Sequence, residues 1–196
     1  MTTSSTRAYP LTLDLEDGSV VVETMGPDDR DAVWAFAKSL PAHDLIFVRR
    51  DISKEKVMDA WVRANGSGSV WTVLARQDGA IVGCVALIRD RLSWSPHVGE
   101  VRALVSPAAR KKGLGRLLIE ECFRKALSDG VEKLVAHMTP DQKGAIGIFE
   151  ELGFRAEALL KDHVKDREGG LHDIVILSCD VERVANQLSA YGVSDA

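Results

Sequence analysis

The stretch that decides how this chain is organised reads Val105-Ser106-Pro107-Ala108-Ala109-Arg110-Lys111-Lys112-Gly113-Leu114-Gly115. It joins a β-rich run to a segment whose leucines recur over a helical face, so a strand is expected to turn into a helix here. The first turn of that helix carries four cations: Arg110, Lys111, Lys112 and Arg116. A helix N-terminus already holds about half a positive charge, so this clustering is unfavourable unless an anion binds the free N–H groups. The sequence therefore predicts a phosphate site.

Two glycines in the same loop favour this interpretation. Gly113 and Gly115 lack a Cβ, so the backbone can approach a ligand closely and adopt positive φ where amides converge. A dinucleotide fingerprint would need a third glycine at Leu118, and a nucleoside-triphosphatase loop would need Gly-Lys-Ser/Thr. A small phosphorylated ligand fits better, although a solvated basic helix start with a glycine turn stays open on these residues alone.

Composition places limits on the rest. The chain has 196 residues, 45% of them hydrophobic and 28% charged, which suits one globular domain with a sizeable core. No apolar run approaches the ~18 residues of a membrane helix, and the polar start lacks a secretory signal, so we expect a cytoplasmic protein. The net charge of −4 offers no global attraction for nucleic acid. Neither nucleic acid nor a membrane is expected as a partner.

The three cysteines, Cys84, Cys122 and Cys179, each lie inside an apolar segment. Their spacing is neither that of a disulfide pair nor that of a metal site. We expect buried small hydrophobes and no metal.

The remaining segments predict an α+β fold with a mixed sheet. Asp78-Gly79 between two β-rich runs is a strong hairpin signal. Strands are expected at 20–23, 70–76, 80–88, 98–105, 131–138, 154–161 and 171–178, and helices near 28–40, 57–64, 114–127 and 141–152. This order cannot form an all-parallel doubly wound sheet. We expect a flexible tail over 1–18, one domain over 19–180, and a C-terminal extension over 181–196 that contains the spacing of a short helix.

The stretch quoted first closely resembles the acetyl-CoA-binding motif of the GNAT superfamily of N-acetyltransferases, which is Arg/Gln-x-x-Gly-x-Gly/Ala after a strand ending in Val-x-Pro. Downstream, Gln142-x-x-Ala145-Ile146-Gly147-Ile148-Phe149-Glu150-Glu151-Leu152-Gly153-Phe154 is similar to the family's Asn-x-x-Ala-x-x-Leu-Tyr-x-x-Leu-Gly-Phe helix. The resemblance covers about Ser19 to Cys179. It implies a GNAT-like, mostly antiparallel central sheet of about seven strands flanked by helices, with a splayed strand pair at a CoA cleft.

The resemblance also implies where acetyl-CoA, the expected co-substrate, binds. The pyrophosphate would lie on the amides from Arg110 to Gly115, and the pantetheine arm would pair with backbone around Ala103 to Val105, where a bulge splays this strand from 131–138. The cofactor-binding residues are then Ala103, Leu104, Val105, Arg110, Lys111, Lys112, Gly113, Leu114, Gly115, Arg116, Gln142 and Phe149.

In this family the acceptor amine attacks the thioester directly, so no cysteine nucleophile is needed. The acceptor ammonium must lose a proton, and Glu100 is the candidate base, with an ordinary ion-paired glutamate as the alternative. A backbone N–H near Val105 would stabilise the oxyanion. Phe149 stands where many relatives have a tyrosine that protonates the leaving thiolate. Gln142 replaces the usual asparagine and keeps an amide.

Four residues are candidates for binding the acceptor: His43, Phe47, His163 and His172. The two later histidines lie in a charged segment that also fits a solvated hairpin, and His137 at a strand end is interpreted as structural. We expect transfer of an acetyl or short acyl group to a small-molecule amine or a peptide N-terminus, by a monomer or homodimer. An acyl-CoA-binding regulatory module with weak or lost catalysis, which Phe149 motivates, and a purely structural protein remain as alternatives.

Overall fold

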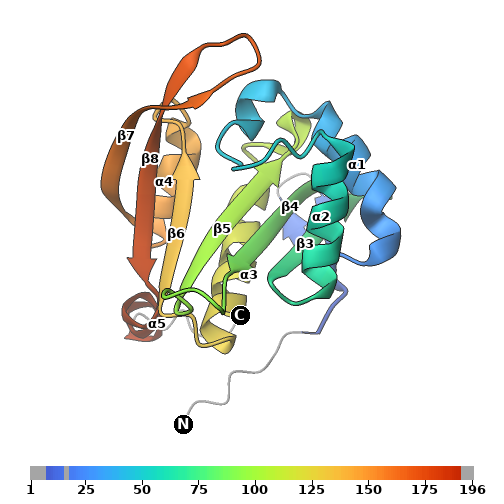
Figure 1. The fold of residues 1–196 in the computed structure, drawn as a ribbon. Helices are drawn as coiled ribbons and strands as arrows, with labels where there is room; N and C mark the ends of the chain where they lie inside the picture. Colours follow the sequence, from blue (N-terminus) through green and yellow to red (C-terminus); the bar gives the residue numbers. More distant parts are fainter. Residues whose placement is uncertain (1–7, 16–17, 191–196) are drawn as a thin grey trace.

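The computed structural model describes residues 8–15 and 18–190, and its centre is an eight-stranded sheet with the order β1-β2-β3-β4-β5-β6-β8-β7 (Figure 1). All neighbouring strands are antiparallel except β5 and β6. The strands are β1 Leu11–Leu15, β2 Gly18–Thr24, β3 Val70–Gln77, β4 Ala80–Arg89, β5 Val98–Val105, β6 Lys133–Met138, β7 Arg155–Lys165 and β8 Leu171–Asp180. This mixed, mostly antiparallel sheet confirms the predicted fold class.

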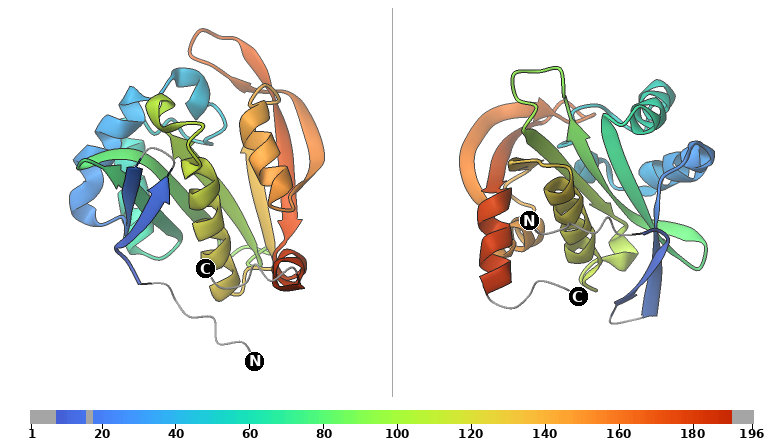
Figure 2. Two further views of the ribbon diagram at one scale, coloured as in Figure 1. Left: turned by 180° about the vertical axis from the view of Figure 1, so that it is seen from behind. Right: turned by 90° about the horizontal axis from the view of Figure 1, so that it is seen from below.

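Helices cover both faces of the sheet (Figure 2). The α-helices are α1 Arg30–Ser39, α2 Glu55–Gly66, α3 Leu114–Ser128, α4 Lys143–Glu151 and α5 Val181–Ala190, and short 3-10 turns occupy η1 Pro27–Asp29, η2 Ala42–Leu45 and η3 Pro107–Ala109. One face carries α1 and α2, and the other carries α3, α4 and α5. Among the described residues, no helix is long and apolar enough to cross a membrane.

The central strands are apolar on both faces because each face has its own core. Val73 and Val85 pack in the core under α3, whereas their neighbours Leu74 and Cys84 pack in the core under α1 and α2. Successive residues of a strand point to opposite faces, so both sets are buried. Val101 of β5 belongs to the core under α3 and Leu104 to the core under α1 and α2, and this strand leads into the glycine loop.

The first strand lies within residues 1–18, which were expected to form a flexible tail and of which 1–7 and 16–17 lie outside the described part. Leu11–Leu15 pairs with β2 in register from Leu11↔Val22 to Leu15↔Gly18, which also raises the strand number from about seven to eight. Leu11, Leu13 and Leu15 pack against the core, while Thr12 and Asp14 are exposed. This alternation is a strand pattern that the sequence interpretation overlooked. At the other end, α5 agrees with the predicted short helix, and residues 191–196 lie outside the described part.

The predicted split between two strands is present, but without the expected bulge. β5 and β6 pair only from Val98↔Lys133 to Val101↔Ala136, after which both strands continue unpaired with each other. The register of β5 with β4 is regular from Gly83↔Val105 to Arg89↔Gly99. Each strand keeps a complete ladder on its outer side, β5 with β4 and β6 with β8, so the two can diverge with no inserted residue.

Candidate functional site

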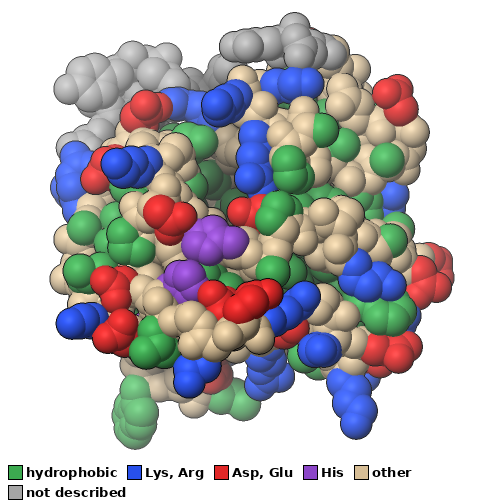
Figure 3. Space-filling model, turned by 90° about the horizontal axis from the view of Figure 1, so that it is seen from above, with side chains coloured by type: hydrophobic (Ala, Val, Ile, Leu, Met, Phe, Trp, Pro, Cys, Tyr) green, Lys and Arg blue, Asp and Glu red, His purple; other side chains and the backbone are tan. Residues whose placement is uncertain are grey.

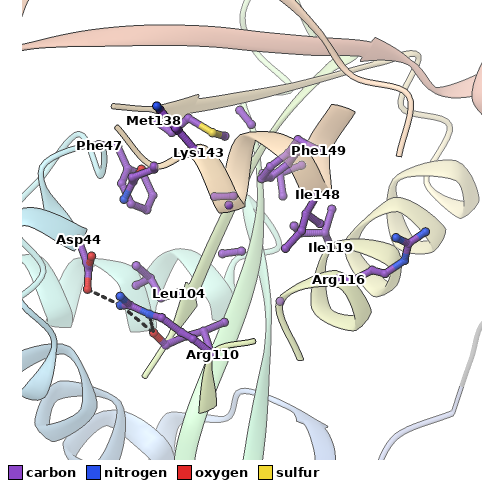
Figure 4. A pocket seen from close by; sticks show the side chains of 18 of the residues that line it. Asp44, Phe47, Leu104, Arg110, Arg116, Ile119, Met138, Lys143, Ile148 and Phe149 are labelled. Atoms are coloured by element: carbon purple, nitrogen blue, oxygen red, sulfur yellow. Dashed lines mark hydrogen bonds and ion pairs between the residues drawn. The ribbon is translucent and has the colours of Figure 1, made fainter. Parts of the chain in front are cut away.

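A cavity of about 510 Å³ lies where β5 and β6 separate. Figure 3 looks onto this end of the molecule and shows a hollow with hydrophobic side chains inside it and charged side chains around it. The wall comes from five segments: Leu40 to Phe47, β5 from Val101, the loop and first turns of α3 from Arg110 to Ile119, β6 from Ala136, and Asp141 to Phe149. Figure 4 shows Asp44 and Phe47 on one side and Ile148 and Phe149 on the other. The cavity therefore joins both predicted motifs.

The N-terminus of α3 opens into this cavity. Gly113 is its N-cap with φ +86°, it supplies no capping side chain, and the first turn holds no acidic residue. The backbone N–H groups of the first turn have no partner within the helix. Gly113 and Gly115 both line the cavity, and a Cβ on Gly115 would lie 3.8 Å from Ile148 Cδ1 and from Val105 Cγ2. The unpaired N–H groups at the start of α3 therefore lie beside the cavity, and a side chain at Gly115 would take up part of that space.

The arginines of the loop form ion pairs with acidic residues of the protein, which the sequence did not indicate. Arg110 pairs with Asp44 at the edge of the cavity, and its Nε and Nη2 each donate to the Val105 carbonyl at 3.2 Å (Figure 4). Arg116 pairs with Glu120 at 3.1 Å and Glu151 at 2.6 Å. These acids offset part of the charge that crowds the helix start. Lys111 lines the cavity, whereas Lys112 and the buried side chain of Leu114 do not.

Glu100, the predicted base, lies beside the cavity and is not among its lining residues. Its side chain is 15% exposed, and Oε1 accepts a hydrogen bond of 2.7 Å from Arg102 Nε. Arg49 Nε lies 3.7 Å from Oε2. Burial opposes ionisation, but the interactions with His137 and Arg102 outweigh it and lower the pKa of Glu100 to about 2. The carboxylate is held as a stable anion.

His137, interpreted from the sequence as structural, lines the cavity and lies beside Glu100. Its side chain is 17% exposed and lines the cavity, and Nδ1 lies 3.6 Å from Glu100 Oε1. Nδ1 is buried and makes no hydrogen bond. The signal in the sequence was its position at the end of β6, but only the split between the strands exposes that position.

Two of the four candidate acceptor residues meet at the cavity mouth and a third lines the wall. Phe47 lines the cavity, and His43 Nε2 is 2.8 Å from Oδ2 of Asp141, which also lines it. The His172 ring lies 5.5 Å from the His43 ring and contacts Asp166 at 2.7 Å. Hydrogen bonds from Thr139 and His43 keep the pKa of Asp141 below its usual value. His163 is exposed and does not line the cavity.

The predicted α4 motif lies along the opposite wall. Gln142 is the N-cap of α4, and its Oε1 accepts a long hydrogen bond of 3.4 Å from the Thr139 N–H. Phe149 is 4% exposed and meets the Phe154 ring edge-on, with the centroids 4.9 Å apart. No tyrosine of the described residues lines the cavity. The residue before the motif, Asp141, was missed because no family position marked it.

All three cysteines are buried, as predicted, and none lines the cavity. Burial raises the pKa of Cys84 and of Cys179 to about 12, so neither thiol is a ready nucleophile. Within residues 8–15 and 18–190, no group of three or more His, Cys, Asp or Glu side chains is arranged to hold a metal ion.

Comparison with solved structures places this architecture among known folds. An acetyltransferase of the GNAT family from Streptococcus pneumoniae matches with a TM-score of 0.71 and 21% identity, over 82% of this chain and 99% of that one. A GNAT superfamily phosphinothricin acetyltransferase from Sinorhizobium meliloti, solved in complex with AcCoA, matches with a TM-score of 0.70 and 18% identity, over 82% of this chain and 88% of that one. At these identities the likeness concerns the fold.

The curated proteins that are similar to this chain in sequence also carry acetyltransferase names. The Danio rerio protein named "Probable N-acetyltransferase 14" is 37% identical over 95 residues, which are 48% of this chain and 32% of that protein. Mycothiol acetyltransferase of Streptomyces avermitilis is 29% identical over 147 residues, 71% of this chain and 44% of that protein. The chain thus spans about a third to a half of the length of the curated relatives it matches. The model of the Acetyltransferase (GNAT) family matches residues 34–154, more than half of the sequence, and this chain therefore belongs to that family.

Proposed function

We propose that this protein transfers an acetyl group from acetyl-CoA to a primary amine by direct attack on the thioester. One observation carries the proposal: a single cavity connects the open amides at the start of α3 with the unpaired edges of β5 and β6. The first end suits a pyrophosphate, and the second suits an extended arm that ends in a reactive group. Membership of the acetyltransferase family supports the same chemistry.

The cofactor would be held mainly by backbone. Its pyrophosphate would accept hydrogen bonds from the amides of Leu114, Gly115 and Arg116, helped by the helix dipole and by Lys111. Its pantetheine arm would run along the free edge of β5 at Ala103 and Leu104 and form strand-like hydrogen bonds there. The Val105 carbonyl already accepts from Arg110, so this arginine would have to move before the arm could use that atom.

The reaction requires a donor for the oxyanion, a place for the acceptor and a means for the CoA sulfur to leave. A backbone N–H on the open edge of β5 would bind the oxyanion of the tetrahedral intermediate. The acceptor would enter beside Phe47, between the His43–Asp141 pair and the charge of Glu100. Phe149 has no proton to give, so the CoA sulfur would leave as thiolate, which a thiol pKa of about 8.5 permits, and be protonated by water.

The regulatory-module alternative is not favoured, since the relatives named above are acetyltransferases. Three further parts of this proposal come from the sequence alone. The acceptor is a small-molecule amine or a peptide N-terminus, the protein is a monomer or homodimer, and its location is cytoplasmic.

The test is an acceptor panel with acetyl-CoA, followed by release of the free thiol. The panel should hold a polyamine, an amino sugar, an amino acid and a peptide with a free N-terminus, and each product should be identified by mass. Calorimetry measures acetyl-CoA binding in parallel. We expect micromolar binding and thiol release with at least one acceptor. Binding without thiol release across the panel would overturn the proposed activity.

A further inference from the structure

The strand split sets one side chain at the point where the reaction would occur. The last pair of the parallel ladder is Val101↔Ala136, so His137 is the first residue of β6 beyond it. Its ring lines the cavity, whereas the Glu100 carboxylate does not. A group that takes a proton from the acceptor has to reach it directly or through one water. The imidazole can contact a group in the cavity directly, whereas the carboxylate, which does not line the cavity, lies 3.6 Å from Nδ1 of that imidazole.

The surroundings of His137 form an ordered series of groups behind the cavity. Its buried Nδ1, which makes no hydrogen bond, lies 3.6 Å from Glu100 Oε1, and that same oxygen accepts the hydrogen bond of Arg102. A carboxylate behind an imidazole selects the tautomer that is protonated on the facing nitrogen and stabilises the imidazolium when it forms. Protonation at Nδ1 leaves the lone pair of Nε2 for the cavity.

Glu100 is a poor base by itself. Interactions with His137 and Arg102 favour its ionised form over the opposing effect of burial, and Arg102 holds Oε1 in place. Because general bases work best when their pKa is near the working pH, a carboxylate with a pKa of about 2 gives little driving force.

We propose that His137 is the catalytic base for the acceptor amine and that Glu100 is a positioning residue acting through it. This proposal rests on the proposed function. The acceptor ammonium gives a proton to Nε2 of His137, and the freed lone pair forms the C–N bond to the acetyl carbon. The C–S bond then breaks with its electron pair on sulfur. The thiolate is protonated as the new amide nitrogen loses its remaining extra proton, and His137 returns its own proton to solvent.

The pH dependence of the rate is the readout that a structural role would not change. The charged and titratable groups that face His137 are Glu100 and Arg102 from β5 and Arg49 from the α1–α2 connection, with the His43–Asp141 pair further along the cavity. With the best acceptor of the panel, kcat/KM of the wild type should fall on the acid side as the imidazole becomes protonated.

His137→Gln should lower kcat about 10²- to 10³-fold and remove this acid limb, while acetyl-CoA binding and melting temperature stay near the wild-type values. Glu100→Gln should lower kcat less and shift the limb to lower pH, because the imidazolium loses its anion. His97→Gln, an exposed histidine before β5, is the matched control and should keep both rate and limb. His137→Asn provides a second variant that keeps an amide near Glu100 but has no base.

A second acceptor tests separately whether the role of His137 is to remove a proton from the amine. An analogue of the best acceptor with a trifluoromethyl group on the carbon that bears the amine is neutral at the assay pH, so it needs no base before it attacks, and it should narrow the difference between wild type and His137→Gln. A His137→Gln protein with kcat within about threefold of wild type and an intact acid limb would overturn the proposal, as would loss of acetyl-CoA binding in that variant. Absence of transfer by the wild type would instead refute the proposed function.

Discussion

Substituting Gly113 should separate two properties of the α3 N-cap: the backbone shape and the space for the cofactor. Gly113 has φ +86°, and a Cβ added to it would meet nothing within 4 Å. Gly113→Ala therefore suffers no clash with the protein, and its cost is the left-handed conformation, about 1 to 2 kcal/mol for an L-residue. In a domain of this size that lowers Tm by roughly 2–8 °C.

The same Cβ would intrude on the cofactor, because Gly113 lines the cavity at the open amides. Loss of one charge-assisted hydrogen bond to a phosphate costs about 1.5 kcal/mol or more, which is about a tenfold rise in Kd. Gly113→Asn provides the contrast, since asparagine tolerates positive φ. It should keep nearly wild-type stability and still lose acetyl-CoA affinity.

Gly147 on α4 is the matched control. It lies inside a helix, a Cβ added to it would meet nothing within 4 Å, and it does not line the cavity. Gly147→Ala should raise stability by about 0.5 to 1 kcal/mol and leave acetyl-CoA binding unchanged. Urea unfolding and calorimetry measure both quantities for all three variants. If Gly113→Ala were as stable as wild type, the backbone argument would be wrong, and if Gly113→Asn bound acetyl-CoA normally, the phosphate cradle would be wrong.

Three single side chains give further predictions. Phe149→Tyr should raise kcat up to about tenfold at constant KM for acetyl-CoA if thiolate departure limits the rate, and an unchanged kcat in steady-state assays would show that water suffices. Lys111→Gly should relieve the positive φ of 61° and gain up to about 1 kcal/mol in urea unfolding, yet weaken acetyl-CoA binding several-fold in low salt; undiminished affinity would contradict a phosphate contact. The lowered pKa of Glu100, about 2 against an ordinary 4.5, supplies stability that is complete above the ordinary value and is lost as pH falls towards 2. Glu100→Gln should therefore remove up to about 3 kcal/mol of the difference in unfolding free energy between pH 7 and pH 2, and an unchanged difference would refute the assignment.

Local patterns were enough to predict most of the elements. Asp78 and Gly79 both have positive φ in the observed β3–β4 turn, which is the geometry that an Asp-Gly hairpin requires. The glycine loop follows β5 and begins α3, as its composition indicated. The one missed strand, Leu11–Leu15, had the right alternation but lies next to a polar terminus, and its pairing with β2 is what makes it a strand.

The sequence by itself was enough to predict a phosphate site at the start of α3, because that prediction depends on neighbours along the chain: glycines, a helix start and its charges. The tertiary structure decided how the remaining groups meet. Arg110 is paired with Asp44, 66 positions away, and Glu100 is enclosed by Arg102, Arg49 and His137 from three segments. Such contacts depend on where β5 and β6 stop pairing and on how the α1–α2 connection packs, and no local pattern encodes either. For this reason Glu100 was predicted as a residue of the site, while the imidazole that lines the cavity beside it emerged only from the fold.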